Sequence, residues 1–270
     1  MQDIDFVDKS FSLTGNKNYR LSIQVCLNGF SFCIYDVDKQ KHVVLKRFSY
    51  SRNITDANLW AKEINTIIDD VPVVKAQAKC LYITQKNVLI PKNIFSEANI
   101  RSYISFLFQL DELDEIQYRY IPEIESYCCF AIPSPVVNKI FYRFGKVDVY
   151  NQVYQAIRRA GQNPGTRMNI VFCDNFMDIS VFRNNKLVLN NSFEIFDIKD
   201  IIYFISAIST KFDVKDIPLY TLGEISNKEI KILKNYFPGI VQEHNPKISL
   251  LLGPEISSKY YNLLSLYECE

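Results

Sequence analysis

The chain has 270 residues, 48% of them hydrophobic and 14% aromatic, which is enough apolar material for two cores of ordinary domain size. It carries 31 basic and 30 acidic residues, a formal net charge of +1. This balance argues against a nucleic-acid partner and against a polybasic membrane tether. The amino terminus is acidic, and no apolar run approaches the roughly 20 residues that span a bilayer. We therefore expect a soluble cytoplasmic protein with no direct membrane insertion.

Cysteine and histidine usage limits the chemistry that the chain can perform. Seven cysteines are scattered through apolar stretches without a CxxC pair, which is typical of reduced, buried thiols. The adjacent pair Cys128-Cys129 predicts two faces of one strand rather than a redox pair. The only histidines are His42 and His244, so histidine-based catalysis or a histidine-rich metal site has little material. We predict no catalytic residue, no metal site and no cofactor.

One local pattern occurs twice, with Leu21–Tyr35 aligning without a gap on Met168–Phe182, 147 positions later. Each copy alternates like a half-buried strand, passes through a polar turn and continues as a second strand. A third strand follows each copy, at 42–48 and 186–193, and then an amphipathic helix. This duplication predicts two lobes, each with a three-strand meander followed by a helix.

The first half contains further predicted elements in chain order. Asn28-Gly29 supplies the first hairpin turn, because both residues tolerate positive φ. The acidic run Asp111–Glu115 predicts a solvated face rather than a cation site. Ser96 is expected to cap a helix. The remaining elements are a helix striped by Trp60 and Ile64, strands at 78–84, 87–90, 116–121 and 127–132, and a helix from Ser134 to Gly145.

The second half repeats the order of the first. A strand at 147–149 and a helix ending at Ala160 lead to a boundary loop at 161–165, so we divide the chain into a lobe 1–146, a connection 147–165 and a lobe 166–270. Asp197 caps a helix, and Ser226 opens another through a capping box with Glu229. The tail 247–270 is apolar enough to pack, but its elements are not assigned.

This order of elements resembles the actin-like ATPase superfamily, which includes sugar kinases, heat-shock chaperones and the cytoplasmic actin-like proteins of pilus assembly and type II secretion. Asn169–Phe193 is similar to the phosphate-facing meander of the pilus-assembly branch, and Ile217–Gly223 to its adenosine-side strand and turn. The resemblance implies an α/β fold of two ribonuclease-H-like lobes, with mixed sheets flanked by helices, around a nucleotide cleft.

The whole chain also resembles an uncharacterised protein family of Bacteroidetes bacteria, a domain family of unknown function. This match rests on Leu21–Ile34, Leu187–Phe193, Asp200–Tyr203, Leu222–Ile225 and Cys269-Glu270. The family implies the same actin-like fold and brings no assigned activity.

The phosphate chemistry of the superfamily is not intact in this sequence. Its two phosphate-holding turns need an Asp for Mg²⁺ and a Gly for close backbone approach. Here the first turn has Gly29 beside Asn28 but no acid, and the second has Asp174 and Asn175 but no glycine. For each, a plain turn is the favoured reading.

On the adenosine side, Gly223 matches one glycine of the family's pair, and Glu224 replaces the other. A carboxylate at that position would repel phosphates. Here too a plain strand-to-helix turn is favoured over a ligand site.

We interpret the sequence as a non-catalytic binding or scaffold protein on a degenerate actin-like fold, with a protein partner of unknown identity. The alternative is a nucleotide-binding ATPase or kinase-like enzyme with a diverged cleft. Candidate cleft residues are Asn28, Gly29, Asp174, Asn175, Gly223 and Glu224. The turns that carry them hold two acids and no lysine or arginine, which favours a cationic or neutral ligand group over an anion.

Overall fold

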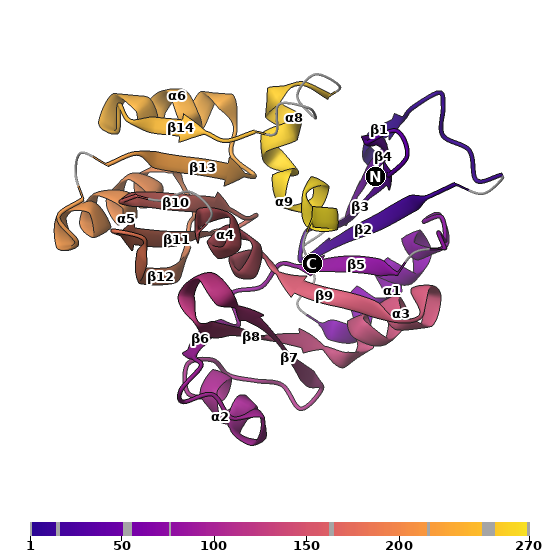
Figure 1. Ribbon diagram of the computed structural model, residues 1–270, viewed down its shortest axis with the longest axis horizontal. Coiled ribbons are helices and arrows are strands. Elements are labelled where there is room, and N and C mark those ends of the chain that lie inside the picture. The colour runs from indigo at the N-terminus through magenta and orange to yellow at the C-terminus, as the bar shows by residue number, and fades with distance from the viewer. Residues whose placement is uncertain are drawn as a thin grey trace. The chain divides into compact units, whose positions relative to one another are not determined.

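The computed structural model describes residues 2–14, 17–50, 56–75, 77–161, 165–214, 217–244 and 252–268 (Figure 1). They form two compact units, one holding the described chain up to Gln155 and from Asn262 onward, the other running over Ala156–Tyr261. The sequence-based division ended the first lobe at 146 and gave the whole tail to the second lobe, so the structure differs in both places. Residues 162–164 of the predicted boundary loop, 245–251 and Cys269-Glu270 lie outside the described residues.

The first unit is built on a six-stranded mixed sheet. The meander strands pair antiparallel, two further strands continue the sheet in parallel, and β1 pairs antiparallel with the outer edge of β4. The alternating apolar residues of the meander explain these strands, because successive side chains point to opposite faces. In spatial order the strands are β1 (Gln2–Val7), β4 (Lys41–Ser49), β3 (Gly29–Asp36), β2 (Tyr19–Cys26), β5 (Ala78–Tyr82) and β9 (Val147–Asn151).

Two helices of the first unit, α1 (Ala57–Ile68) and α3 (Ser134–Phe144), pack against each other. The Asp56 carboxylate caps α1 by accepting hydrogen bonds from two backbone N–H groups of its first turn. The predicted stripe is confirmed, since Trp60 and Ile64 of α1 are buried. Gly145 ends α3 as predicted, at a positive φ of 73°.

A separate three-stranded antiparallel sheet lies between β5 and β9 in the chain and belongs to the first unit. Its spatial order is β6 (Asn87–Pro91), β8 (Ser126–Pro133) and β7 (Asp114–Ile121), accompanied by helix α2 (Ile100–Ser105) and the 3₁₀ turns η1 (Glu97–Asn99) and η2 (Pro122–Ile124). Ser96 precedes η1 but makes no side-chain capping bond, so the expected cap is wrong.

The second unit contains a five-stranded sheet that begins after helix α4 (Gln152–Gly161), within which the two units divide. Side chains of α5 and α6 complete an apolar core on one face of the sheet. The spatial order is β12 (Lys186–Glu194), β11 (Phe176–Arg183), β10 (Arg167–Phe172), β13 (Leu219–Gly223) and β14 (Ile240–Gln242), with α5 (Ile198–Lys211), α6 (Asn227–Tyr236) and α8 (Pro254–Lys259).

The two sheets confirm the duplication residue by residue. Leu21 pairs with Ile34 in the first hairpin, and Met168 pairs with Val181 in the second, which is the same pairing 147 positions later. Each meander also shifts register at the same place, between Ile34 and Tyr35 in β3 and between Val181 and Phe182 in β11. A shared bulge of this kind indicates one lobe topology used twice.

Capping boxes begin both helices of the second core, as predicted. Asp197 and Asp200 cap α5 reciprocally, and Ser226 and Glu229 do the same for α6. Among the described residues, no helix has the length and apolar character needed to cross a membrane.

The carboxy-terminal segment of the chain packs on the first sheet. This segment, α9 (Tyr261–Leu264) and the 3₁₀ turn η3 (Leu266–Glu268), belongs to the first unit from Asn262 onward. Arg20 of β2 donates to the backbone carbonyl of Tyr267 (3.0 Å), and the Tyr267 ring stacks on Tyr35 with centroids 3.9 Å apart. As a result β2, which its alternation predicted to be half-buried, is buried on both faces.

Two further side chains anchor the same segment. His42 Nε2 donates to the carbonyl of Leu264 (2.8 Å), and Cys33 Sγ donates to that of Leu263 (3.6 Å). Burial lowers the pKa of His42 to about 4, so the ring is neutral near pH 7.

All six described cysteines are buried, and none of these six forms a disulfide. Burial raises the pKa of Cys33, Cys80 and Cys129 to about 12, so these thiols stay protonated. Cys128 Sγ contacts Asn151 of β9, whereas Cys129 joins the core of the small sheet. The two neighbours therefore face opposite sides of one strand, as predicted.

Candidate functional site

The first candidate turn joins β2 to β3, and it differs from the prediction. Leu27-Asn28 forms the turn, while Gly29 is already the first residue of β3 and pairs with Cys26. The predicted positive φ is wrong for both Asn28 and Gly29. Gly29 is instead required by close packing, because a Cβ there would lie 2.6 Å from the carbonyl oxygen of Phe48.

The Asn28 side chain is held by its own lobe. Its Oδ1 accepts hydrogen bonds from Arg47 Nη2 (3.0 Å) and Cys26 Sγ (2.9 Å). The buried Arg47 therefore brings a positive charge to this turn, which the sequence reading missed because Arg47 lies on β4, far along the chain. The only signal was the hairpin register that places Arg47 opposite Ser31.

The second candidate turn joins β10 to β11 and is a two-residue turn as predicted. Asp174 and Asn175 are exposed, and Cys173 N donates to Phe176 O (2.9 Å) to close the turn. Phe176 is buried, so its ring fills the position next to the turn instead of leaving space for a phosphate. The Asn175 carbonyl accepts from Ile195 N (3.0 Å), which ties the turn to the end of β12.

Gly223 ends β13 in a conformation that only glycine adopts easily. Its φ is +95°, and a Cβ would lie 2.1 Å from the carbonyl oxygen of Phe172. The next residue, Glu224, donates its backbone N–H to that same oxygen (2.8 Å). The close approach of this turn to β10 thus explains why position 223 is a glycine, without reference to a ligand.

The structure brings four of the six candidate residues to the same end of the second sheet, where the turns after β10 and β13 lie. β10 and β13 are parallel, with Phe172 paired to Gly223, so the turns that carry Asp174 and Glu224 leave the sheet at the same end. Carboxyl ends of parallel strands are common positions for ligand-binding residues. Asn28 and Gly29 belong to the other unit. Among the described residues, no group of three His, Cys, Asp or Glu side chains is placed to hold a metal ion.

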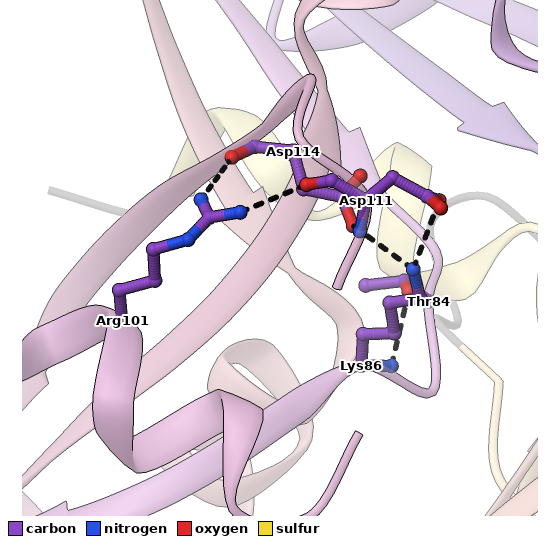
Figure 2. Close-up of polar contacts among 5 residues, drawn as sticks. All are labelled: Thr84, Lys86, Arg101, Asp111 and Asp114. Atoms are coloured by element: carbon purple, nitrogen blue, oxygen red, sulfur yellow. Dashed lines mark hydrogen bonds and ion pairs between the residues drawn. The ribbon is translucent and has the colours of Figure 1, made fainter. Parts of the chain in front are cut away.

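The acidic run Asp111–Glu115 is only partly the solvated face that was predicted, since Asp111 and Glu112 are exposed but Asp114 is not. Asp114 is buried, and its Oδ2 accepts from Lys86 Nζ (2.9 Å) and from the backbone N–H of Asp111 (3.0 Å). Figure 2 shows Arg101 of α2 donating hydrogen bonds to the backbone carbonyls of Asp111 and Asp114. The donor–acceptor distance is 2.8 Å in both. Lys86 is in turn held by Thr84, whose hydroxyl accepts from the Lys86 backbone N–H (3.1 Å).

These contacts brace the segment Phe106–Leu113, which we call the braced loop. Three of its large apolar side chains are exposed, Phe106 to 87%, Leu107 to 58% and Leu113 to 52%, whereas Phe108 and Leu110 pack against the core of the small sheet. Asp111 and Glu112 are also exposed on the same loop. Single exposed apolar residues are ordinary, whereas three on one loop make this loop a candidate interaction surface.

A family model described as "Protein of unknown function (DUF3822)" matches residues 8–240 of the chain. The chain belongs to this family. The predicted resemblance to a family of unknown function is therefore confirmed, and no activity comes with it. No curated protein matches the sequence of this DUF3822 protein significantly.

Two solved structures are similar to the DUF3822 chain. One is a Bacteroides thetaiotaomicron VPI-5482 protein with an actin-like ATPase fold and unknown function, at 19% identity over 87% of this chain and 96% of that chain, with a TM-score of 0.75. The other is from the PilM–PilN type IV pilus biogenesis complex, at 10% identity over 93% of this chain and 98% of that chain, with a TM-score of 0.62. The likeness to the first structure confirms the predicted actin-like ATPase fold, and at these identities both likenesses show the fold alone.

Proposed function

We propose that this protein is a non-catalytic cytoplasmic binding protein that recognises a protein partner through the braced loop. The observation that carries the proposal is the exposure of Phe106 and Leu107 on a segment whose Phe108 and Leu110 pack against the core and whose far end, at Asp111 and Asp114, is held by Arg101 and Lys86. Fixing a loop before binding reduces the entropy lost in the complex. Burying a phenylalanine side chain in an interface contributes about 1.5–3 kcal/mol.

The candidate turns support a non-catalytic role over the alternative, a diverged ATPase or kinase. The Asn28 side chain accepts hydrogen bonds from Arg47 and Cys26. Close packing explains the glycines at positions 29 and 223. The buried Phe176 lies next to the turn that carries Asp174. Because close packing already explains why glycine is needed at both positions, neither glycine is evidence of a turn that brings backbone N–H groups to a phosphate. The near-zero net charge supports a protein partner over a nucleic acid.

The similar PilM structure offers one example of partner binding on this fold, since it is a complex of PilM with PilN. The partner of the present chain follows from different evidence, the composition of the braced loop. An apolar centre beside Asp111 and Glu112 favours a partner segment that combines apolar and basic side chains.

Cross-linking in the native host tests the proposal. The tagged chain and a Phe106→Ser/Leu107→Ser variant would be compared by quantitative mass spectrometry of their cross-linked partners. Phe196→Ser serves as the matched control, because Phe196 is equally exposed (89%) but lies on the second unit. We expect the amount of one cross-linked partner to fall at least tenfold with the double variant and to stay unchanged with the control. Identical partner sets for all three proteins would contradict the proposal.

A further inference from the structure

The duplicated lobes differ at one edge of their sheets. β4 and β12 are equivalent, since each is the third strand of its meander and each carries the extra residue of the shared bulge, Val43 in β4 and Val188 in β12. In the first unit the outer edge of β4 is covered by β1, whereas β12 is the outermost strand of its sheet among the described residues. The pairing of β1 with β4 therefore indicates what kind of segment the edge of β12 accepts.

The pairing of β1 with β4 shows how the edge is used. The strands are antiparallel, with Phe6 opposite Leu45, and Asp8 N donates to Val43 O (2.8 Å) just beyond β1. At that end Lys41 Nζ binds the Asp8 carboxylate at 2.8 Å. Backbone hydrogen bonds, with an ion pair at one end, thus join β1 to β4.

β12 retains the features that make this pairing possible. It is nine residues long and contains no proline, so its outer backbone groups present a continuous edge. The equivalent bulge of β4 does not prevent pairing, because β1 pairs with β4 as far as Val44 and Asp8 N donates to the carbonyl of Val43 at the bulge. Val188, 41% exposed, lies on this edge strand. Edges of this length are usually covered, twisted away or used for binding.

Charges at the two ends of β12 indicate the direction of an added strand. Lys186 is the counterpart of Lys41, because Lys41 pairs with Asp36 and Lys186 with Arg183, positions related by the repeat. Glu194 lies at the other end, and both side chains are exposed. An antiparallel segment with a basic residue first and an acidic residue last would meet an opposite charge at each end.

We propose that the outer edge of β12 binds an extended segment of a protein partner as an additional antiparallel strand, with its basic end at Glu194 and its acidic end at Lys186. This deepens the proposed function and rests on it, since it assigns a second surface to the same partner. Main-chain hydrogen bonds would supply affinity, and the terminal charges would set orientation, as in other cases of strand addition.

Binding of designed peptides to the full chain tests the proposal. The probe is a fluorescent seven-residue peptide alternating valine and threonine between an amino-terminal lysine and a carboxy-terminal aspartate. Its control has the two charged residues exchanged. We expect the first peptide to bind wild type about three- to tenfold more tightly than the control, as two exposed ion pairs allow. A Lys186→Glu/Glu194→Lys variant should reverse this preference, and hydrogen exchange should slow in residues 186–194.

The opposite results overturn the proposal. They are failure of both peptides to bind at millimolar concentration, a preference that survives the charge swap, or protection at β14 instead of β12. The cross-linking experiment separates this failure from that of the proposed function. If the charge-swapped chain keeps a Phe106-dependent partner while both peptides fail, only the edge-strand proposal falls. If no Phe106-dependent partner exists, the proposed function falls.

Discussion

His42 Nε2 donates a hydrogen bond to the backbone carbonyl of Leu264, 222 residues away in sequence and 2.8 Å away in space. This contact, with those of Arg20 and Cys33, attaches the carboxy-terminal segment to the first lobe. Because the ring is buried and neutral, the attachment is sensitive to acid.

The free energy of unfolding should therefore fall as the pH decreases from about 6.5 to about 4. The folded pKa of His42 is about 4, below its ordinary value of 6.5, so the unfolded chain takes up the proton first and is favoured as the pH falls. The contribution of His42 is fully present above pH 6.5 and amounts to roughly 3 kcal/mol. Urea unfolding at a series of pH values measures it. His42→Gln should flatten the curve over this interval, and an unchanged difference between the two proteins at pH 7 and pH 4 would contradict the prediction.

Gly223→Ala should destabilise the protein by roughly 3 kcal/mol or more, since it combines a strained φ with a clash against Phe172 O. Gly145→Ala is the matched control, because Gly145 also has a positive φ, +73°, but no atom within 4 Å of the added Cβ. The control should be destabilised only by the backbone strain, about 1–3 kcal/mol, without the additional cost of a clash. Equal losses in denaturant unfolding would mean that the close approach to β10 is unimportant.

Asp114→Ala should destabilise the protein by about 2–4 kcal/mol, because it leaves Lys86 and the Asp111 N–H without their buried acceptor. It should also speed hydrogen exchange across the braced loop. Asp111→Ala removes an acid that is 78% exposed and should cost under about 0.5 kcal/mol. Similar effects of the two substitutions would contradict the assignment of Asp114 as the brace.

Mg²⁺-ATP at millimolar concentration should not raise the melting temperature. Useful binding would add about 2.7 kcal/mol at a hundredfold excess over the dissociation constant, which thermal unfolding detects easily. A rise in melting temperature that EDTA abolishes would favour the enzyme alternative.

Replacing Asp174 and Glu224 together by Ala should leave the folded state intact, because Asp174 is exposed and the hydrogen bond from Glu224 to Phe172 is donated by the backbone, which the substitution keeps. Circular dichroism and urea unfolding measure this. Loss of the folded state would show that these acids are structural and would remove them as ligand-binding candidates.

Local sequence determined much of this protein. The alternation of apolar residues predicted the two hairpins and their equivalent registers, since side-chain direction in a strand has a period of two. Asp197 and Ser226 predicted two helix starts, because a capping side chain acts within three residues of itself. The actin-like fold followed from this order of elements.

Tertiary structure decided everything that depends on segments distant in the chain. The pairing of β1 with β4, the three-residue strand β14 and the packing of α9 and η3 on the first sheet have no local periodic signal, because each depends on a surface that forms only after folding. The same holds at the candidate sites. Gly29 is fixed by Phe48 and Asn28 by Arg47, and Asp114 lies buried beside Lys86, so an acidic run that reads as solvated in sequence becomes the support of an exposed apolar loop.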